Sequence, residues 1–151
     1  MSVPHPGGDP NVHLYEQLKR DVLERVPQIA SVEYVPDDIE AKHLRATFDP
    51  HRLEPPTGPE APELVVTWYR GSPRDWFRVD YGDPNTGFHA GWHQDEDHPD
   101  LGYAHVQYSF PDWDETHRTG IAFEHETPSL VLWEIVDDLL ETVLPTDADP
   151  G

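Results

Sequence analysis

Two segments of the chain place apolar residues at the spacing of an amphipathic helix. The first starts at Asp9 and Pro10, an N-cap residue followed by proline in the first turn, and is stopped by Pro27. Its apolar stripe consists of Leu14, Tyr15, Leu18, Val22 and Val26. The second opens at Thr127 and is predicted to end near Pro145, and its stripe consists of Leu132, Val136, Leu139 and Val143. The pattern therefore predicts one helix near each end of the chain.

Between these helices, short segments alternate apolar and polar residues and are separated by turns rich in Pro, Gly and Asp. They lie near residues 31–35, 42–48, 63–70, 75–82, 87–93, 103–110 and 118–125. Residues 50–62 contain five prolines, which cannot donate ladder hydrogen bonds, so an extended surface loop is expected there. We predict one α+β domain over residues 10–145, with a single antiparallel sheet of six or seven strands packed on one face by an N-terminal and a C-terminal helix. Residues 1–9 and 146–151 are expected to be disordered.

Turn residues set the pairing of three of these segments. Hairpin loops at residues 71–74 and 83–86 would pair Trp68 with Phe77 and Phe77 with Trp92. The same register gives the pairs Val66 with Val79, Leu64 with Tyr81, Tyr81 with Phe88, and Val79 with Ala90. One face of the three strands is then entirely apolar, and a slip of one residue would destroy this pattern. We therefore expect this face to lie under the two helices.

The opposite face, called the polar face below, collects ionisable and aromatic side chains. The predicted register sets Asp80 opposite His89, Trp76 opposite His93, and Arg78 opposite Gly91. Neighbouring segments would add Tyr69, Tyr103, His105, Gln107, Arg118 and Glu124. The histidines, the arginine and the aspartate on this face are the main chemical lead in the chain.

The charge of the chain indicates its environment before its function. Asp and Glu number 30 against 10 Lys and Arg, which gives a formal charge of −20 on 151 residues, and Lys19 and Lys42 are the two lysines. So many like charges destabilise a compact state in dilute salt, whereas at about 1 M salt the Debye length is only about 3 Å. The composition resembles that of small haloarchaeal α+β proteins. That resemblance implies a cytoplasm rich in KCl and a need for high KCl for stability.

Several classes of site are excluded by what the sequence lacks. Without cysteine the chain has no disulfide, thiolate metal site or Cys nucleophile. It has no stretch of about 20 apolar residues and no basic, apolar leader, so we expect a cytoplasmic protein without membrane contact. P-loop, G-x-S-x-G, H-E-x-x-H and Rossmann glycine motifs are also absent. The common nucleotide enzymes and zinc proteases are therefore excluded.

Metal binding is the first of three hypotheses for the polar face. His89 and His93 lie four residues apart in a strand, which separates them by about 13 Å and is too far for one ion. A better set is His93 and His105 across a hairpin, supplemented by Asp95, Asp97 or His98 from the loop that follows. Imidazole and carboxylate ligands suit zinc or manganese. The acidic residues of this loop are also typical of a solvated turn, and the sequence favours that interpretation.

Acid–base catalysis is the second hypothesis. Asp80 would fix the tautomer of His89, His105 would be the second acid–base group, and Arg78 would stabilise an anion. Two histidines and a cation on one face suit cleavage of an RNA phosphodiester, although Asp–His pairs are also ordinary cross-strand pairs. Nucleic-acid binding usually needs a basic patch, and this acidic chain offers one only locally, at Arg70, Arg74 and Arg78.

The third hypothesis is a binding or interaction module without chemistry. Tyr69, Trp76 and Tyr103 would wall a groove between sheet and loop, with Gln107 and Glu124 on the same face. Exposed aromatic residues also mark dimer interfaces, so a homodimer is the alternative reading of this face. The sequence does not separate these two roles.

Residues 77–85 read Phe-Arg-Val-Asp-Tyr-Gly-Asp-Pro-Asn, and His89, His93, His98 and His105 follow them. Over about residues 64–125 this arrangement resembles the core of small TumE-type toxins of toxin–antitoxin pairs, which is rich in tyrosine, aspartate and histidine. The resemblance implies a growth-inhibiting protein, chemistry at Asp80, His89 and His105, and a DNA-binding antitoxin as partner. The tandem histidines of those proteins are absent here, and the two terminal helices are additional.

Overall fold

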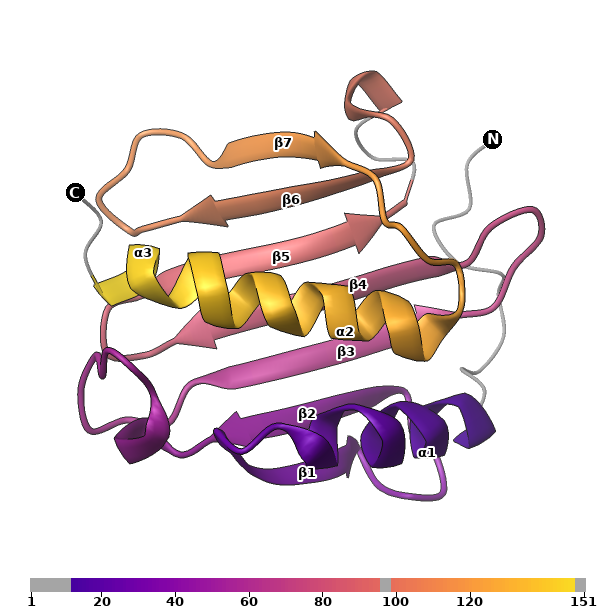
Figure 1. Cartoon of the computed structure of the whole chain (residues 1–151), viewed down its shortest axis with the longest axis horizontal. Helices are drawn as coiled ribbons and strands as arrows, with labels where there is room; N and C mark the ends of the chain where they lie inside the picture. Colours follow the sequence, from indigo (N-terminus) through magenta and orange to yellow (C-terminus); the bar gives the residue numbers. More distant parts are fainter. Residues whose placement is uncertain (1–11, 96–98, 149–151) are drawn as a thin grey trace.

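The computed structural model describes residues 12–95 and 99–148, and these form one α+β unit (Figure 1). The strands are β1 (Ile29–Val35), β2 (His43–Phe48), β3 (Glu63–Tyr69), β4 (Trp76–Asp83), β5 (Phe88–Gln94), β6 (Ala104–Ser109) and β7 (His117–Ile121). They form a single antiparallel sheet of seven strands in the order of the sequence, so each strand pairs with its neighbours along the chain. The predicted fold class is confirmed. Short turns suffice for such a meander because every connection joins adjacent antiparallel strands.

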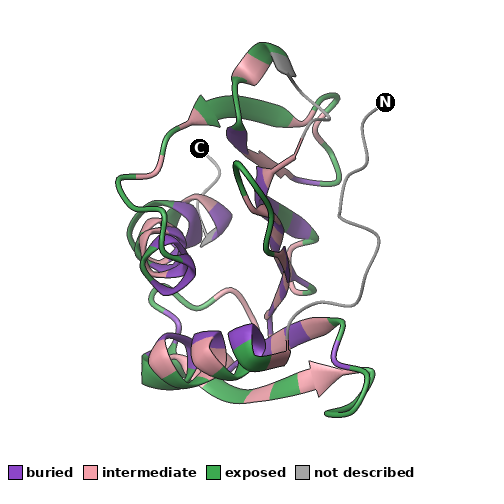
Figure 2. Cartoon of the chain, turned by 90° about the vertical axis from the view of Figure 1, so that its right-hand side faces the viewer, coloured by how far each residue is buried: buried purple, intermediate pink, exposed green. Residues whose placement is uncertain are grey.

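Both helical segments cover the same face of the sheet (Figures 1 and 2). The first consists of α1 (Val12–Asp21) and a 3₁₀ turn at Leu23–Arg25, and the second begins with α2 (Pro128–Asp138). The indole Nε1 of Trp133 in α2 donates to the carbonyl oxygen of Asp21 at 3.2 Å, which ties the two segments together. Beneath them Trp68 stacks on Phe77 with ring centroids 4.2 Å apart. The apolar face of the sheet is therefore the core, as its alternation predicted.

The C-terminal helix continues past the boundary that the sequence predicted. A π-helical turn at Leu139–Val143 follows α2, and α3 (Leu144–Ala148) follows that turn, so the helix does not end near Pro145. The π turn breaks the α-type hydrogen-bond ladder, and Pro145 falls in the first turn of a new α segment, where a missing N–H is tolerated. Of the ends expected to be disordered, residues 146–148 are helical, and residues 1–9 and 149–151 lie outside the described residues.

The pairing of β3 with β4 is the predicted one, and the pairing of β4 with β5 is not. Trp68 pairs with Phe77, as predicted. In the second hairpin Phe77 pairs with Gln94 in place of Trp92, and the other predicted partners shift by two residues: Val79 pairs with Trp92, Tyr81 with Ala90, Asp80 with Gly91, and Arg78 with His93.

Gly87 is the physical reason for this shift. It has φ of 75° and its N–H donates to the carbonyl oxygen of Asp83 at 2.8 Å. Glycine takes this left-handed conformation without a steric penalty, so the turn uses residues 84–87 and Asp83 pairs with Phe88. A shift of two residues keeps every side chain on its predicted face because strands alternate with a period of two.

The proline-rich segment is held against the second hairpin. It contains a 3₁₀ turn at Pro50–Arg52, and Leu53 is buried in the core. The hydroxyl of Thr57 donates to Asp83 Oδ2 at 2.5 Å, and Asn85 Nδ2 donates to the carbonyl oxygen of Glu60 at 2.8 Å. The segment is the expected loop, but side-chain hydrogen bonds fix its position.

Candidate functional site

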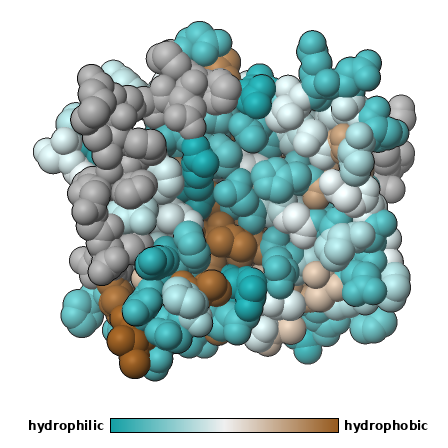
Figure 3. All heavy atoms as spheres, turned by 180° about the vertical axis from the view of Figure 1, so that it is seen from behind, coloured by the Kyte–Doolittle hydropathy of each residue, from teal (hydrophilic) through white to brown (hydrophobic). Residues whose placement is uncertain are grey.

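The helix-free side of the sheet is the polar face that the sequence predicted. Seen from behind, it is mostly hydrophilic, with a smaller hydrophobic area near its centre (Figure 3). Its side chains form two rows that cross the strands. Arg78, His93 and His105 pair in one row, and the next row consists of Asp80, Gly91, Gln107 and Arg118.

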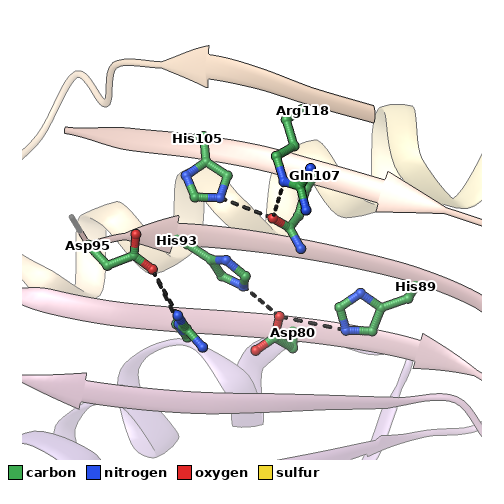
Figure 4. A network of polar contacts seen from close by, with 8 residues as sticks. Asp80, His89, His93, Asp95, His105, Gln107 and Arg118 are labelled. Atoms are coloured by element: carbon green, nitrogen blue, oxygen red, sulfur yellow. Dashed lines mark hydrogen bonds and ion pairs between the residues drawn. The ribbon is translucent and has the colours of Figure 1, made fainter. Parts of the chain in front are cut away.

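Asp80 is the centre of the polar network (Figure 4). Its Oδ1 lies 2.7 Å from Nε2 of His93 and 3.7 Å from Nε2 of His89. The sequence predicted His89 as the partner, and the two-residue shift in pairing makes His93 the closer one. A carboxylate can only accept, so Nε2 of His93 carries the proton of this hydrogen bond. Asp80 thus hydrogen-bonds His93 and lies near His89, which is the more accessible histidine, with 47% of its side chain exposed against 9% for His93.

Gly91 makes this contact sterically allowed. It pairs with Asp80, and a Cβ atom at its position would lie 2.5 Å from Asp80 Oδ1 and 2.7 Å from His93 Nε2. Any side chain there would displace one of the two partners. Sequence reasoning did not assign Gly91 a role, although a glycine inside a strand is a signal of close approach.

His105 lies beside His93 and belongs to a second branch of the network. Their ring centroids are 5.2 Å apart in an edge-to-face arrangement, and both residues are buried, at 2% and 7% exposure. Nε2 of His105 lies 3.1 Å from Gln107 Oε1, which also accepts from Arg118 Nε at 3.3 Å. Arg118 reaches the polar face as predicted, and its exposed guanidinium is the positively charged group that contacts Gln107.

Arg78 was expected to stabilise an anion and is instead neutralised within the fold. Its Nη2 lies 3.2 Å from Oδ2 of Asp95, a side chain with no exposed surface, and its guanidinium carbon lies 5.5 Å from the centroid of the Trp76 ring. Asp95 is therefore the ion-pair partner of Arg78.

Of the predicted metal ligands, the structure brings His93 and His105 side by side, with ring centroids 5.2 Å apart. Their ring nitrogens contact other groups, Asp80 for His93 and Gln107 for His105. Asp95 contacts Arg78, while Asp97 and His98 lie outside the described residues. Within residues 12–95 and 99–148, the one group with three potential ligand atoms within 4.8 Å of one another consists of Glu124, His125 and Glu134. Such donors suit zinc or manganese. The carboxylate of Glu134 already accepts from the backbone N–H groups of Glu124 and His125.

Glu124 does not lie on the polar face. It lies beyond the end of β7 and its backbone N–H donates to Glu134 of α2, which places it on the helix side. Phe123 packs near Phe77, with ring centroids 5.7 Å apart, so its ring faces the core. The last predicted strand is therefore shorter than expected and turns toward the helix after Ile121.

The three predicted aromatic residues do not wall one groove. Tyr69 and Trp76 contact each other edge to face at 5.4 Å, whereas Tyr103 lies beneath the guanidinium of Arg74. The three arginines of the expected basic patch likewise do not form one cationic surface, because each has a different partner. Arg70 pairs with Asp75 at 3.0 Å, Arg78 pairs with Asp95, and Arg74 stacks on Tyr103.

His43 joins the polar face and was missed by the sequence analysis. Its Nδ1 lies 2.7 Å from the hydroxyl of Thr67, in the same cross-strand row as Arg78. Burial, together with Lys42, lowers the pKa of His43 below its ordinary value. Extending the predicted register to the second strand would have found it.

No family model matches the chain, and no curated protein or solved structure matches it. Within the described ranges, no helix combines the length and the apolar character that a membrane crossing requires. The geometry of the polar face is therefore the basis for a functional assignment.

Proposed function

We propose that the polar face is an acid–base site that cleaves a phosphodiester, with single-stranded RNA as the substrate. The observation that carries the proposal is the position of Asp80 between two imidazoles, at 2.7 Å from His93 and 3.7 Å from His89. A carboxylate in this position fixes the tautomer of an imidazole and stabilises the imidazolium that forms when it accepts a proton.

His89 is the proposed general base because it is the accessible histidine of the pair. It would remove the proton of a ribose 2′-hydroxyl, whose oxygen bonds to phosphorus as the bond to the 5′ oxygen breaks. The imidazolium of His89 can return the proton to that leaving oxygen. His93 is a positioning residue in this proposal, because its hydrogen bond holds Asp80 in place. Arg118, exposed on the same face, supplies the cation for the phosphate.

The net charge of −20 opposes RNA binding in dilute salt, and strong screening removes much of that opposition. We therefore place the reaction at high KCl. The resemblance to TumE-type toxins supports the same class of substrate and, with it, growth inhibition and an antitoxin partner. The proposed location of the activity is a cytoplasm rich in KCl.

The test is cleavage of a labelled RNA oligonucleotide in multimolar KCl by the wild type and by His89→Asn and Asp80→Asn. We expect either substitution to lower the rate at least about 100-fold, as loss of an acid–base group does. His51→Asn is the matched control, because His51 lies exposed in the 3₁₀ turn far from the polar face. Full activity of His89→Asn, or no cleavage by the wild type, would overturn the proposal.

Expression in a growing host gives a second readout. Wild-type protein is expected to arrest growth, and Asp80→Asn at the same expression level is not. Equal growth with both proteins would contradict the toxin-like role.

A further inference from the structure

A cavity of about 530 Å³ opens on the helix side of the sheet, the face opposite to the Asp80 network. It lies between the loop that joins β3 to β4 and the segment that joins β7 to α2. Its apolar wall is formed by Trp68, Phe77, Tyr103, Ile121, Phe123 and Val131. This volume and this mixture of aromatic and polar lining are typical of sites for small organic ligands.

Arg74 and Tyr103 form a cation–π pair at the mouth of this cavity. The guanidinium carbon of Arg74 lies 3.3 Å from the centroid of the Tyr103 ring, and Tyr103 is 66% exposed. Stacking fixes the plane of the guanidinium and leaves its N–H donors along the edge, where a carboxylate or phosphate can accept them. Tyr103 therefore positions Arg74 and also offers an aromatic surface at the cavity mouth.

The charge of Arg74 is not neutralised by the described part of the chain. Arg70 on the same loop pairs with Asp75, and that carboxylate also accepts from the Trp68 indole at 2.9 Å and from the Gly71 N–H at 3.0 Å. No carboxylate among residues 12–95 and 99–148 pairs with Arg74. In a chain with 30 acidic and 10 basic residues, an arginine without a carboxylate partner in the described residues is available to bind an anion.

We propose that this cavity binds a small aromatic anion, with its ring against Tyr103 and Phe123 and its acidic group against Arg74. Glu126 also lines the cavity and would repel an acidic group, so we place that group against Arg74. The site is separate from the polar face, so the proposal stands independently of RNA cleavage.

The probe is 1-anilinonaphthalene-8-sulfonate, an aromatic anion that becomes fluorescent on binding, titrated in multimolar KCl. The neutral dye N-phenyl-1-naphthylamine has a similar ring system without the charge. We expect Arg74→Gln to weaken binding of the sulfonate about tenfold and to leave binding of the neutral dye unchanged. Arg25→Gln removes one exposed positive charge from the far 3₁₀ turn and should change neither titration.

Four results would overturn the proposal: no binding of the sulfonate to the wild type, equal affinity in Arg74→Gln, equal weakening in Arg25→Gln, or no displacement of the dye by either of two competing anions. Competition separates two sources of the anion. Displacement of the dye by indole-3-acetate identifies an aromatic carboxylate, displacement by adenosine monophosphate identifies a nucleotide, and displacement by neither overturns the assignment. Cleavage activity of the Asp80 site is expected to be unchanged in Arg74→Gln, so each proposal can be contradicted without affecting the other.

Discussion

The carboxyl groups of Asp83 and Asp147 interact with each other in the interior, where both residues are almost completely buried. Two buried carboxyl groups can lie together at low cost only if one of them carries a proton. The Thr86 hydroxyl donates to Asp147 at 2.6 Å, and the Thr57 hydroxyl donates to Asp83. This pair fastens α3 to the turn between β4 and β5.

The two carboxyl groups shift in opposite directions. Burial first, and then the hydrogen bond with Asp83, raises the pKa of Asp147 from 3.8 to about 8. Burial also acts to raise the pKa of Asp83, but hydrogen bonds from Asp147, Thr57 and Asn85 outweigh it, and the pKa of Asp83 is lowered. Asp147 is therefore the protonated member of the pair at neutral pH.

Asp147→Asn is expected to stabilise the protein near neutral pH. The folded chain keeps a proton on Asp147 that the unfolded chain releases above pH 3.8, so the stability contributed by this group falls as pH rises from about 4 to about 8. Asparagine is neutral throughout and can donate to Asp83. We expect a gain on the order of 2 kcal/mol in unfolding free energy near pH 8, shrinking to nothing near pH 4. Denaturant melts across this pH range measure it.

Asp137→Asn is the matched control, because Asp137 is exposed on α2 and lies on the same C-terminal helix. Its effect on stability should be small and independent of pH. A pH-independent effect of Asp147→Asn would show that the pair does not share a proton.

Gly91→Ala is expected to break the contact of Asp80 with His93. The new Cβ would lie within 2.7 Å of atoms of both partners, and relieving the overlap should cost about 1–3 kcal/mol of stability. RNA cleavage should fall as in Asp80→Asn. Gly82→Ala is the control, because a Cβ at Gly82 meets nothing within 4 Å. Equal cleavage by Gly91→Ala and the wild type would mean that the contact has no catalytic role.

Tyr15→Phe is expected to destabilise the fold by about 1–3 kcal/mol. The Tyr15 hydroxyl donates to the carbonyl oxygen of Lys42 at 2.6 Å and accepts from the Trp68 N–H at 3.1 Å, and burial raises its pKa. Without the hydroxyl, both backbone groups lose a partner in the interior. Tyr34→Phe, at a partly exposed ring beneath Lys19, should change the thermal midpoint little. Equal thermal midpoints for the two variants would argue against a stabilising role of the two hydrogen bonds made by the Tyr15 hydroxyl.

Potassium chloride is expected to raise the thermal midpoint steeply at low concentration and less steeply above about 1 M, where the Debye length is about 3 Å. The reason is the charge of −20, whose repulsion is largely screened by then. Sucrose stabilises by exclusion without screening and serves as the control. A midpoint that is independent of KCl would contradict the halophilic interpretation.

Alternation and helical spacing predicted most of the fold because both are local signals of burial. The core face of β3 and β4, from Leu64 to Trp68 and from Phe77 to Tyr81, was predicted residue by residue. The pairing of β4 with β5 was not, because Asp83 and Gly87 are both plausible turn residues and only the φ of Gly87 decides between them. The end of the last helix was misplaced because proline also fits the first turn of α3.

For β3 to β6 the sequence by itself determined which residues share the polar face, because strand alternation survives a register shift of two. The sequence could not determine which side chains on that face contact each other. The hydrogen bond of Asp80 with His93 depends on the turn between β4 and β5 and on the space that Gly91 leaves. The pair of Asp83 with Asp147 and the cavity beside Arg74 depend on segments far apart in the chain. Alternation follows from the local geometry of one strand, whereas these contacts follow from the packing of several elements, and tertiary structure alone decides them.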